Sequence, residues 1–328
     1  MGGTKIAVAP VDRGGIQLAP PVVALSLKED ADALISGLEA LLRRALAEFD
    51  RFSPSAIGLA CAGTIDAGRG EVVTSPNLPL VDVPLAPMLQ VSLGMPVALE
   101  NDGNAAVLGE ALAGAAVGLR NVVMLTLGTG VGGGLFLDGQ IYRGAAGGAG
   151  ELGHTVVQMG GLPCHCGNRG CLEMYASGPA LARYASARAR DVERDPDGAL
   201  LALRERGELN GGMVAKMARE GHQGAVEAVR QLGDWLGIGL VNIANTFDPE
   251  MIVVGGGVGE LGELLLHPAR EHLRKFAMPP GRDHVQVAAA KLGNKAGLVG
   301  AGLAAWKAFG DGDHWNPGTP APGTGAAG

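Results

Sequence analysis

Apolar residues recur at two periods along the chain, and these periods separate predicted helices from predicted strands. Leucines repeat at helical spacing between residues 30 and 50, which places them on one helix face. A second helix of this kind is predicted over residues 224–246, and a closing helix over 298–309. Short apolar runs predict buried strands, and they cover residues 56–60, 96–99, 121–127, 134–137 and 251–254. Together these elements indicate an α/β protein.

A weak internal repeat divides the chain into similar halves. Gly2-Gly3-Thr4-Lys5 precedes a predicted hairpin of residues 5–8 and 15–18, with its turn at 12–15. Gly128-Thr129-Gly130 accompanies a second predicted hairpin. This repeat suggests two similar α/β lobes around a cleft, as in the sugar kinase, Hsp70 and actin superfamily. We expect a small lobe over residues 1–106 plus 298–309, a large lobe over 107–297 and a disordered tail over 310–328.

Composition and charge narrow the classes of function. The hydrophobic fraction of 47% allows a sizeable core. The net charge of −7, without a long basic run, argues against nucleic acid or an anionic membrane as partner. No apolar stretch reaches the ~18 residues of a membrane span, and the N-terminus lacks the charged and apolar regions of a signal peptide. We therefore expect a cytoplasmic protein.

Two glycine segments follow predicted strands and could hold phosphate. Gly128-Thr129-Gly130 opens the longer segment, which continues to Gly134, and Gly255-Gly256-Gly257 follows the strand at 251–254. Backbone N–H groups approach phosphate closely where no side chain intervenes. Glycine patterns are weak evidence on their own. A plain hairpin turn and a plain strand-to-helix turn therefore stay open as alternatives.

A polar cluster, Glu100-Asn101-Asp102-Gly103-Asn104, follows the predicted strand at 96–99. Phosphoryl transfer to a hydroxyl needs a carboxylate that takes the proton, and Asp102 is a candidate for this general base. Asn101 beside it can donate and accept hydrogen bonds to sugar hydroxyls. The alternative for Asp102 is a cap of the following helix.

Three of the four cysteines form a C-x-C-x4-C pattern at Cys164, Cys166 and Cys171, ten residues after His154. One imidazole and three thiolates make a closed tetrahedral zinc site, and three buried thiols without metal are the alternative. Glu151 and Glu173 flank this segment and are candidate acceptors for sugar hydroxyls, unless they are solvated surface acids. The phosphate loop, the metal knuckle and the acids together predict a kinase of a polyhydroxylated substrate.

These motifs resemble those of the ROK family, whose members are mostly bacterial sugar kinases together with related repressors. The family's C-x-C-G-x-x-G-C-x-E pattern matches Cys164 to Glu173. Its E-x-G-H pattern matches Glu151 to His154, and its E-N-D-x-N-A pattern matches Glu100 to Ala105. The resemblance extends from Gly2 to about Phe309. The chain looks most like the ATP-dependent glucose kinases of the family.

The resemblance implies transfer of phosphate from ATP to the 6-hydroxyl of D-glucose, by a homo-oligomer that is a dimer or a tetramer. Asp102 would be the general base. The residues that would bind the sugar are Asn77, Asn101, Asp102, Glu151, His154 and Glu173. Those that would bind ATP, with Mg²⁺ bridging its phosphates, are Gly3, Thr4, Lys5, Gly128, Thr129, Gly130, Gly255 and Gly256. Those that would hold structural Zn²⁺ are His154, Cys164, Cys166 and Cys171.

The sequence leaves alternatives open. A kinase of another hexose or of an N-acylhexosamine would show a similar polar set. A ROK repressor would carry a DNA-binding helix-turn-helix before the first phosphate turn, where this sequence has no residues, and it would show a basic patch. A sugar-binding relic without catalysis is the third alternative, because the family's first strand, which ends in Asp, is missing ahead of Met1. We expect the gene to encode that strand upstream.

Overall fold

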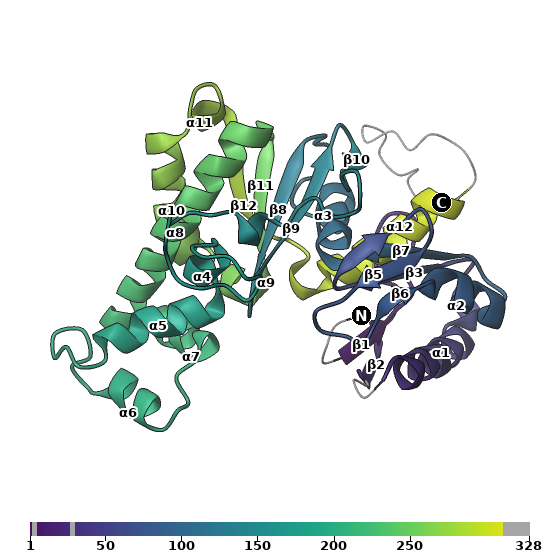
Figure 1. Cartoon of the computed structure of the whole chain (residues 1–328), viewed down its shortest axis with the longest axis horizontal. Helices are drawn as coiled ribbons and strands as arrows, with labels where there is room; N and C mark the ends of the chain where they lie inside the picture. Colours follow the sequence, from purple (N-terminus) through teal and green to yellow (C-terminus); the bar gives the residue numbers. More distant parts are fainter. Residues whose placement is uncertain (2–4, 27–29, 311–328) are drawn as a thin grey trace, which may run out of the picture. The chain divides into compact units, whose positions relative to one another are not determined.

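The computed structural model describes residues 1, 5–26 and 30–310, and the chain divides into two compact units (Figure 1). Unit 1 comprises Met1–Arg120, Asp138–Ala149 and Lys295–Gly328, and unit 2 comprises Asn121–Leu137 and Gly150–Asn294. The predicted lobe boundary after residue 106 falls inside a helix that belongs entirely to unit 1. Apart from Gly310, the tail predicted to be disordered lies outside the described residues.

Unit 1 combines short strands with helices from both ends of the chain. Its strands are β1 (Lys5–Val8), β2 (Val22–Leu25), β3 (Ile57–Cys61), β4 (Thr64–Asp66), β5 (Glu71–Thr74), β6 (Val81–Val83), β7 (Val97–Asn101) and β10 (Gln140–Ile141). Its helices are α1 (Ala31–Glu48), η1 (Asp50–Phe52), α2 (Leu85–Leu93), α3 (Asp102–Ala113) and α12 (Ala296–Phe309). β1 pairs with β2, β3 runs parallel to β7, and β4, β5 and β6 form an antiparallel sheet.

The first hairpin differs from its prediction. β1 pairs with β2 at Val22–Leu25, whereas the sequence predicted residues 15–18 as its partner. The predicted turn is present, since the Asp12 carboxylate accepts hydrogen bonds from the backbone of Gly14 at 3.0 Å and Ile16 at 2.7 Å. Next to this turn the ladder is reduced to one isolated bridge between Val11 and Gln17. Prolines at 10, 20 and 21 lack the N–H that a ladder requires, so regular pairing resumes only beyond them.

Helix α1 confirms the helix that the leucine periodicity predicted. Asp30 caps its first turn, because the carboxylate accepts a hydrogen bond from the N–H of Ala33 at 2.7 Å. The face that packs into the core of unit 1 consists of Leu34, Leu38, Leu41 and Leu42, all of them buried. Each such leucine stabilises the fold by about 1.5–3 kcal/mol through burial. The amphipathic pattern is therefore sufficient to place this helix against the sheets.

Helices α3 and α12 pack at unusually short range. A Cβ atom on Gly300 of α12 would overlap the carbonyl oxygen of Ala105, and one on Gly109 of α3 would lie 2.5 Å from the carbonyl oxygen of Ala296. On β3, a Cβ atom on Gly58 would overlap the backbone of α12 in the same way. The missing side chains allow backbone to meet backbone. The chain passes directly from the end of β7 at Asn101 into the first turn of this packed helix at Asp102.

Unit 2 is built around a mainly parallel sheet. Its strands are β8 (Val122–Leu127), β9 (Val131–Leu137), β11 (Met251–Gly255) and β12 (Gln286–Ala289). Its helices are η2 (Leu152–His154), α4 (Glu173–Ala176), α5 (Gly178–Arg188), α6 (Ala199–Glu205), α7 (Gly211–Arg219), α8 (Gln223–Phe247), α9 (Gly256–Gly259), α10 (Glu263–Phe276) and α11 (Gly281–His284). The short η3 (Gly293–Lys295) spans the boundary with unit 1.

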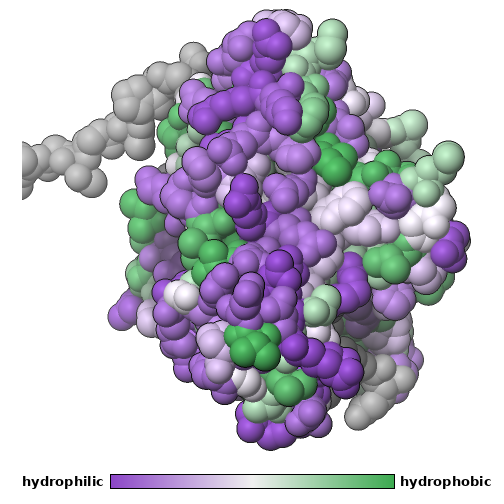
Figure 2. All heavy atoms as spheres, turned by 90° about the vertical axis from the view of Figure 1, so that its left-hand side faces the viewer, coloured by the Kyte–Doolittle hydropathy of each residue, from purple (hydrophilic) through white to green (hydrophobic). Residues whose placement is uncertain are grey.

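Within unit 2 the strands run in the order β9-β8-β11-β12, and only β9 is antiparallel to its neighbour. β11 is buried along its whole length and β8 at all positions except Thr126, as expected for strands covered on both faces. The side of the molecule turned to the viewer in Figure 2 is mainly hydrophilic, with apolar residues in separate small patches. Among the described residues, no helix has both the length and the apolar character that a membrane span requires.

Candidate active site

The turn between β8 and β9 is the predicted phosphate loop, and hydrogen bonds within unit 2 hold it in place. The N–H of Gly128 donates to the carbonyl of Gly130 at 2.9 Å, and the N–H of Gly178 donates to the carbonyl of Gly128 at 2.8 Å. A Cβ atom on Gly130 would overlap the Glu173 carboxylate. That carboxylate in turn accepts a hydrogen bond from the N–H of Val131 at 3.0 Å. Glycine is therefore required at Gly130 for the acid to reach the turn.

A cavity of about 650 Å³ opens beside this turn. It is lined by Gly128, Thr129, Gly178, Pro179, Ala182, Leu209, Asn210, Gly211, Gly212, Ala215, Gly257 and Val258. None of the described residues that line it is charged. Its walls are small and largely apolar, with a few polar groups, as in sites for flat, uncharged ligand moieties. The cavity therefore suits a nucleoside better than a bare anion.

The cavity includes only some of the predicted ATP residues. Gly255 and Gly256 are not part of its lining, although the next residue, Gly257, is. A Cβ atom on Gly256 would overlap the backbone of Leu127, so this glycine serves the close approach of β11 to β8. Gly3 and Thr4 lie outside the described residues, and Lys5 is an exposed residue at the start of β1.

Sequence reasoning missed the residues at the beginnings of α5 and α7. The Asn210 side chain caps α7 by accepting from the N–H of Met213 at 3.1 Å, and its amide also donates to the carbonyl of Glu208 at 2.9 Å. A Cβ atom on Gly211 would lie 2.7 Å from the carbonyl of Gly178, so the two helix starts touch through glycine. The sequence Asn210-Gly211-Gly212 at a helix start was the available signal.

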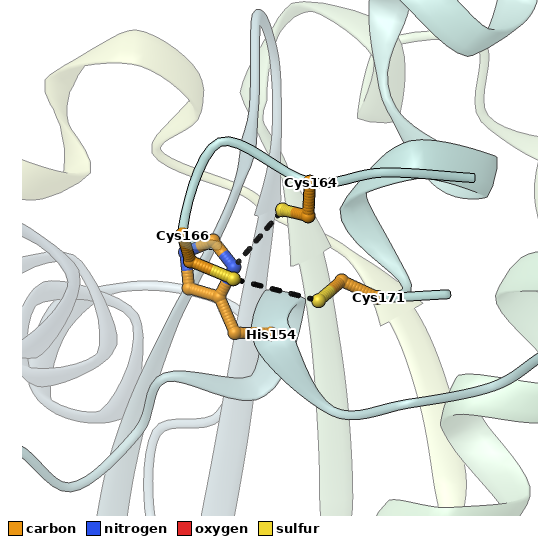
Figure 3. Close-up of side chains that lie close together, drawn as sticks. All are labelled: His154, Cys164, Cys166 and Cys171. Carbon is orange, nitrogen blue, oxygen red and sulfur yellow. Dashed lines mark hydrogen bonds between the residues drawn. The ribbon is translucent and has the colours of Figure 1, made fainter. Parts of the chain in front are cut away.

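The predicted metal ligands do come together. The ligand atoms of His154, Cys164, Cys166 and Cys171 lie within 4.8 Å of one another. Figure 3 shows their side chains pointing toward a common centre. The Cys166 and Cys171 sulfurs are 3.7 Å apart, and the Cys164 sulfur is 3.6 Å from Nδ1 of His154. This group could hold a metal ion.

Backbone hydrogen bonds within the cysteine segment define its fold. The N–H of Cys164 donates to the carbonyl of Asn168 at 2.8 Å, and the N–H of Gly167 donates to the carbonyl of Cys164 at 3.0 Å. Gly167 has a φ of 89°, which favours glycine in this turn. Burial raises the pKa of the Cys171 thiol to about 12 and also raises the pKa of Cys164. A metal that binds here must therefore displace protons from buried thiols.

The predicted sugar-binding acids of unit 2 surround the same cluster. Nδ1 of His154 faces the cysteines, while its Nε2 lies 4.0 Å from the exposed carboxylate of Glu151. Oε2 of Glu173 is bound to the N–H of Val131, and Oε1 lies 3.8 Å from the Cys164 sulfur. Glu173 thus links the cysteine segment to the glycine turn, a role that the sequence did not reveal.

Two of the three predicted sugar-binding residues of unit 1, Asn101 and Asp102, lie at the end of β7 and the start of α3. Asn101, and not Asp102, caps α3, because its side-chain oxygen accepts from the N–H of Asn104 at 3.0 Å. Its amide nitrogen donates to the carbonyl of Gly63 at 2.9 Å. Asp102 is the first residue of α3, and its side chain is exposed. Asn77 is exposed in the loop between β5 and β6.

Comparisons with known proteins agree with these motifs. The ROK family model matches residues 1–308. The chain belongs to the ROK family. A glucokinase of Streptomyces coelicolor is 40% identical over 306 residues, which cover 92% of this chain and 94% of that protein. The crystal structure of a ROK family glucokinase from Streptomyces griseus in complex with glucose and AMPPNP is 39% identical and superposes with a TM-score of 0.80, covering 94% of this chain and 97% of that one.

The solved ROK structure confirms the predicted fold class, the actin-like fold of sugar kinases. Similarity within the family also extends to repressors. A putative xylose repressor from Caldicellulosiruptor sp. is 31% identical over 280 residues, which cover 85% of this chain and 69% of the repressor. Family membership alone therefore does not separate a kinase from a regulator, and the geometry of the site has to do so.

Proposed function

We propose that the protein is a glucokinase, which transfers the γ-phosphoryl group of ATP to the 6-hydroxyl of D-glucose. The observation that carries this proposal is that Asn101 and Asp102, at the end of β7, have different roles. Asn101 caps α3, so the exposed carboxylate of Asp102 is not needed as a cap. A carboxylate held on a rigid helix start is suited to accept a proton from a substrate hydroxyl. The similarity to glucokinases, which extends over 94% of the Streptomyces coelicolor protein and 97% of the Streptomyces griseus structure, supports this proposal.

Asp102 would accept the proton of the 6-hydroxyl as that oxygen attacks the γ-phosphorus. Asn101 would bind a neighbouring hydroxyl, and Asn77 would extend the same contact surface. Among the residues of unit 2, the Glu151 carboxylate and Oε1 of Glu173 would accept hydrogen bonds from the remaining hydroxyls, and the Nε2–H of His154 would donate one. Several such contacts fix the orientation of the reacting hydroxyl, which contributes much of the rate in phosphoryl transfer.

The nucleotide would bind to unit 2. The uncharged cavity would take the nucleoside, and the Gly128-Thr129-Gly130 turn at its edge would offer N–H groups to the phosphates. Mg²⁺, when bound, would neutralise charge on the phosphate oxygens. Gly3, Thr4 and Lys5 would complete the phosphate contacts. Gly255 and Gly256 would act indirectly, by shaping the strand end beside Gly257.

Two interatomic distances in the cysteine cluster support zinc as the proposed metal. With Zn–S bonds of about 2.3 Å and Zn–N bonds of about 2.0 Å, a tetrahedron separates two sulfurs by about 3.8 Å and a sulfur from a nitrogen by about 3.5 Å. The distances of 3.7 Å and 3.6 Å agree with these values. Four protein ligands leave no open position, so the ion would be structural and would hold His154 and Glu173 in place. Thiolate ligation also favours a reducing compartment, and we therefore propose that the protein is cytoplasmic. We further propose, from the family resemblance, that it is a homo-oligomer.

A panel of sugars tests the proposed function. The purified protein, with ATP and Mg²⁺, is assayed against glucose, mannose, fructose, N-acetylglucosamine and N-acetylmannosamine. Glucose should give the highest kcat/KM. A higher value for an N-acylhexosamine would favour the alternative sugar kinase. Sugar binding without phosphorylation, combined with specific DNA binding, would favour a repressor and contradict the proposal.

A further inference from the structure

A buried carboxylate lies two positions before the proposed catalytic base. Glu100, near the end of β7, is only 2% exposed, whereas Asp102 is exposed. Removing a carboxylate from water costs several kcal/mol unless partners compensate it. Its partners therefore indicate what the charge does.

Glu100 uses its two oxygens for two different tasks. Oε1 accepts hydrogen bonds from the backbone N–H of Asn101 and from the side-chain amide of Asn104, each at 3.1 Å. These are the two residues that form the cap of α3, on either side of Asp102. Oε2 accepts from Nε of Arg143 at 3.0 Å and also from its Nη2. One carboxylate thus ties the cap of α3 to a distant arginine.

Arg143 belongs to the segment that follows β10. Its carbonyl accepts a hydrogen bond from the N–H of Ala149 at 3.1 Å, which closes the loop just before Glu151. The side chain is 41% exposed, while the Glu100 side chain is 3% exposed. The glutamate side of the ion pair is therefore buried, whereas the arginine side is accessible to solvent. Sequence reasoning did not single out Arg143, because no local pattern marks it.

We propose that the Glu100–Arg143 pair is a positioning device for the proposed base. Neither residue needs to touch the substrate. The arginine compensates the buried charge, the charge holds both residues of the cap, and the cap fixes the direction of the Asp102 carboxylate. This proposal rests on the proposed function of Asp102.

Arg143→Met tests the device because it removes the guanidinium and keeps an unbranched apolar side chain. Glu100 is then a buried charge without its cation, and it can be accommodated only by moving or by taking up a proton. Either change loosens the cap. Misplacement of a reacting group by about 1 Å can cost about 10²-fold, so kcat should fall by about 10–100-fold. KM for ATP should change by less than about threefold, because none of the residues proposed to bind ATP belongs to the cap.

A double-mutant cycle separates positioning from simple stabilisation. Glu100→Gln keeps the shape and loses the charge, and Glu100→Gln/Arg143→Met removes both charges. The loss from Arg143→Met should be at least about tenfold smaller in the Glu100→Gln background, because no buried charge remains to be compensated. Arg143→Lys should restore part of kcat. The matched control is the exposed pair of Asp66 and Arg69 in the same unit, whose Asp66→Asn/Arg69→Met cycle should leave kcat unchanged.

All kcat values are referred to the folded fraction, measured by circular dichroism at the assay temperature. Wild-type kcat in folded Arg143→Met, or independent effects of Glu100→Gln and Arg143→Met, would overturn the positioning proposal. If Arg143→Met does not fold, the neutral double variant decides, since wild-type kcat in that variant would overturn the proposal equally. A wild-type protein that does not phosphorylate glucose would instead contradict the proposed function itself.

Discussion

At the end of β7, two adjacent residues perform tasks that a single aspartate often combines. Asn101 caps the start of α3 with its side-chain oxygen and donates one amide N–H to the carbonyl of Gly63, which leaves its second amide N–H for a substrate hydroxyl. Asp102 contributes the exposed carboxylate. The sequence pattern alone could not decide between cap and base for Asp102, because both roles favour an acid at a helix start. In the structure, the neighbouring Asn101 provides the cap.

Asp102→Asn should therefore abolish catalysis with little effect on the fold. The amide has nearly the same shape but cannot take the proton, so kcat should fall by about 10²–10⁴-fold or more. Glucose binding, measured by calorimetry, should stay close to that of the wild type. Asp82→Asn is the control, since Asp82 is an exposed aspartate of the same unit outside the proposed site. Turnover near the wild-type value in Asp102→Asn would remove this residue from the mechanism.

At the scale of elements, the sequence predicts what local periodicity determines and misses what distant packing determines. The leucine spacing was enough to predict α1, and the apolar runs were enough to predict β8 and β11. The partner of β1 was predicted wrongly, because prolines interrupt the ladder beside the turn. The nucleotide-sized cavity was missed in part, because the starts of α5 and α7 meet only in the folded unit.

The close packing of α3 on α12 should be sensitive to one added methyl group. Gly300→Ala places a Cβ atom against the carbonyl of Ala105, and overpacking of this kind costs about 1–3 kcal/mol, or more where backbone must move. Gly297→Ala on the same helix is the control, since its Cβ would have only the carbonyl of Asp102 nearby, at 3.9 Å. It should be neutral or stabilising by up to about 1 kcal/mol. Urea unfolding measures both variants, and equal stabilities would contradict the packing argument.

The cysteine segment should depend on its metal. Cys166→Ser removes one of four ligands, so zinc content and Tm should both fall. The KM for glucose should rise as His154 and Glu173 lose their anchor. Cys61→Ser is the control, because Cys61 is buried in the core of unit 1 and should not alter the zinc content. Elemental analysis gives the decisive value, and less than half an equivalent of zinc in active wild-type protein would refute a structural zinc site.

At the scale of the whole molecule, the residues proposed to bind the substrates are distributed over both units of the chain. The proposed base and Asn77 belong to unit 1, whereas the nucleotide cavity, the cysteine cluster and the remaining sugar ligands belong to unit 2. The internal repeat in the sequence indicated such a two-part organisation. It could not supply the boundaries, because α12 and the segment Asp138–Ala149 return to unit 1 after the chain has entered unit 2.

The charge of the whole chain bears on the phosphoryl donor. A long polyanion such as polyphosphate is attracted by a basic groove, and its rate of binding falls steeply with salt. This chain has a net charge of −7, and the described residues that line the cavity beside the glycine turn carry no charge. A nucleoside gains contact with those small apolar walls, whereas polyphosphate has nothing to place there. We therefore expect ATP to support glucose phosphorylation at least about tenfold faster than polyphosphate, a preference of about 1.4 kcal/mol.

Initial rates with the two donors are compared at equal concentrations of transferable phosphate, at low and high ionic strength, with polyphosphate from which nucleotide has been removed. Equal rates with the two donors, or a polyphosphate rate that exceeds the ATP rate at low salt, would show that the donor is recognised through charge and not through the cavity.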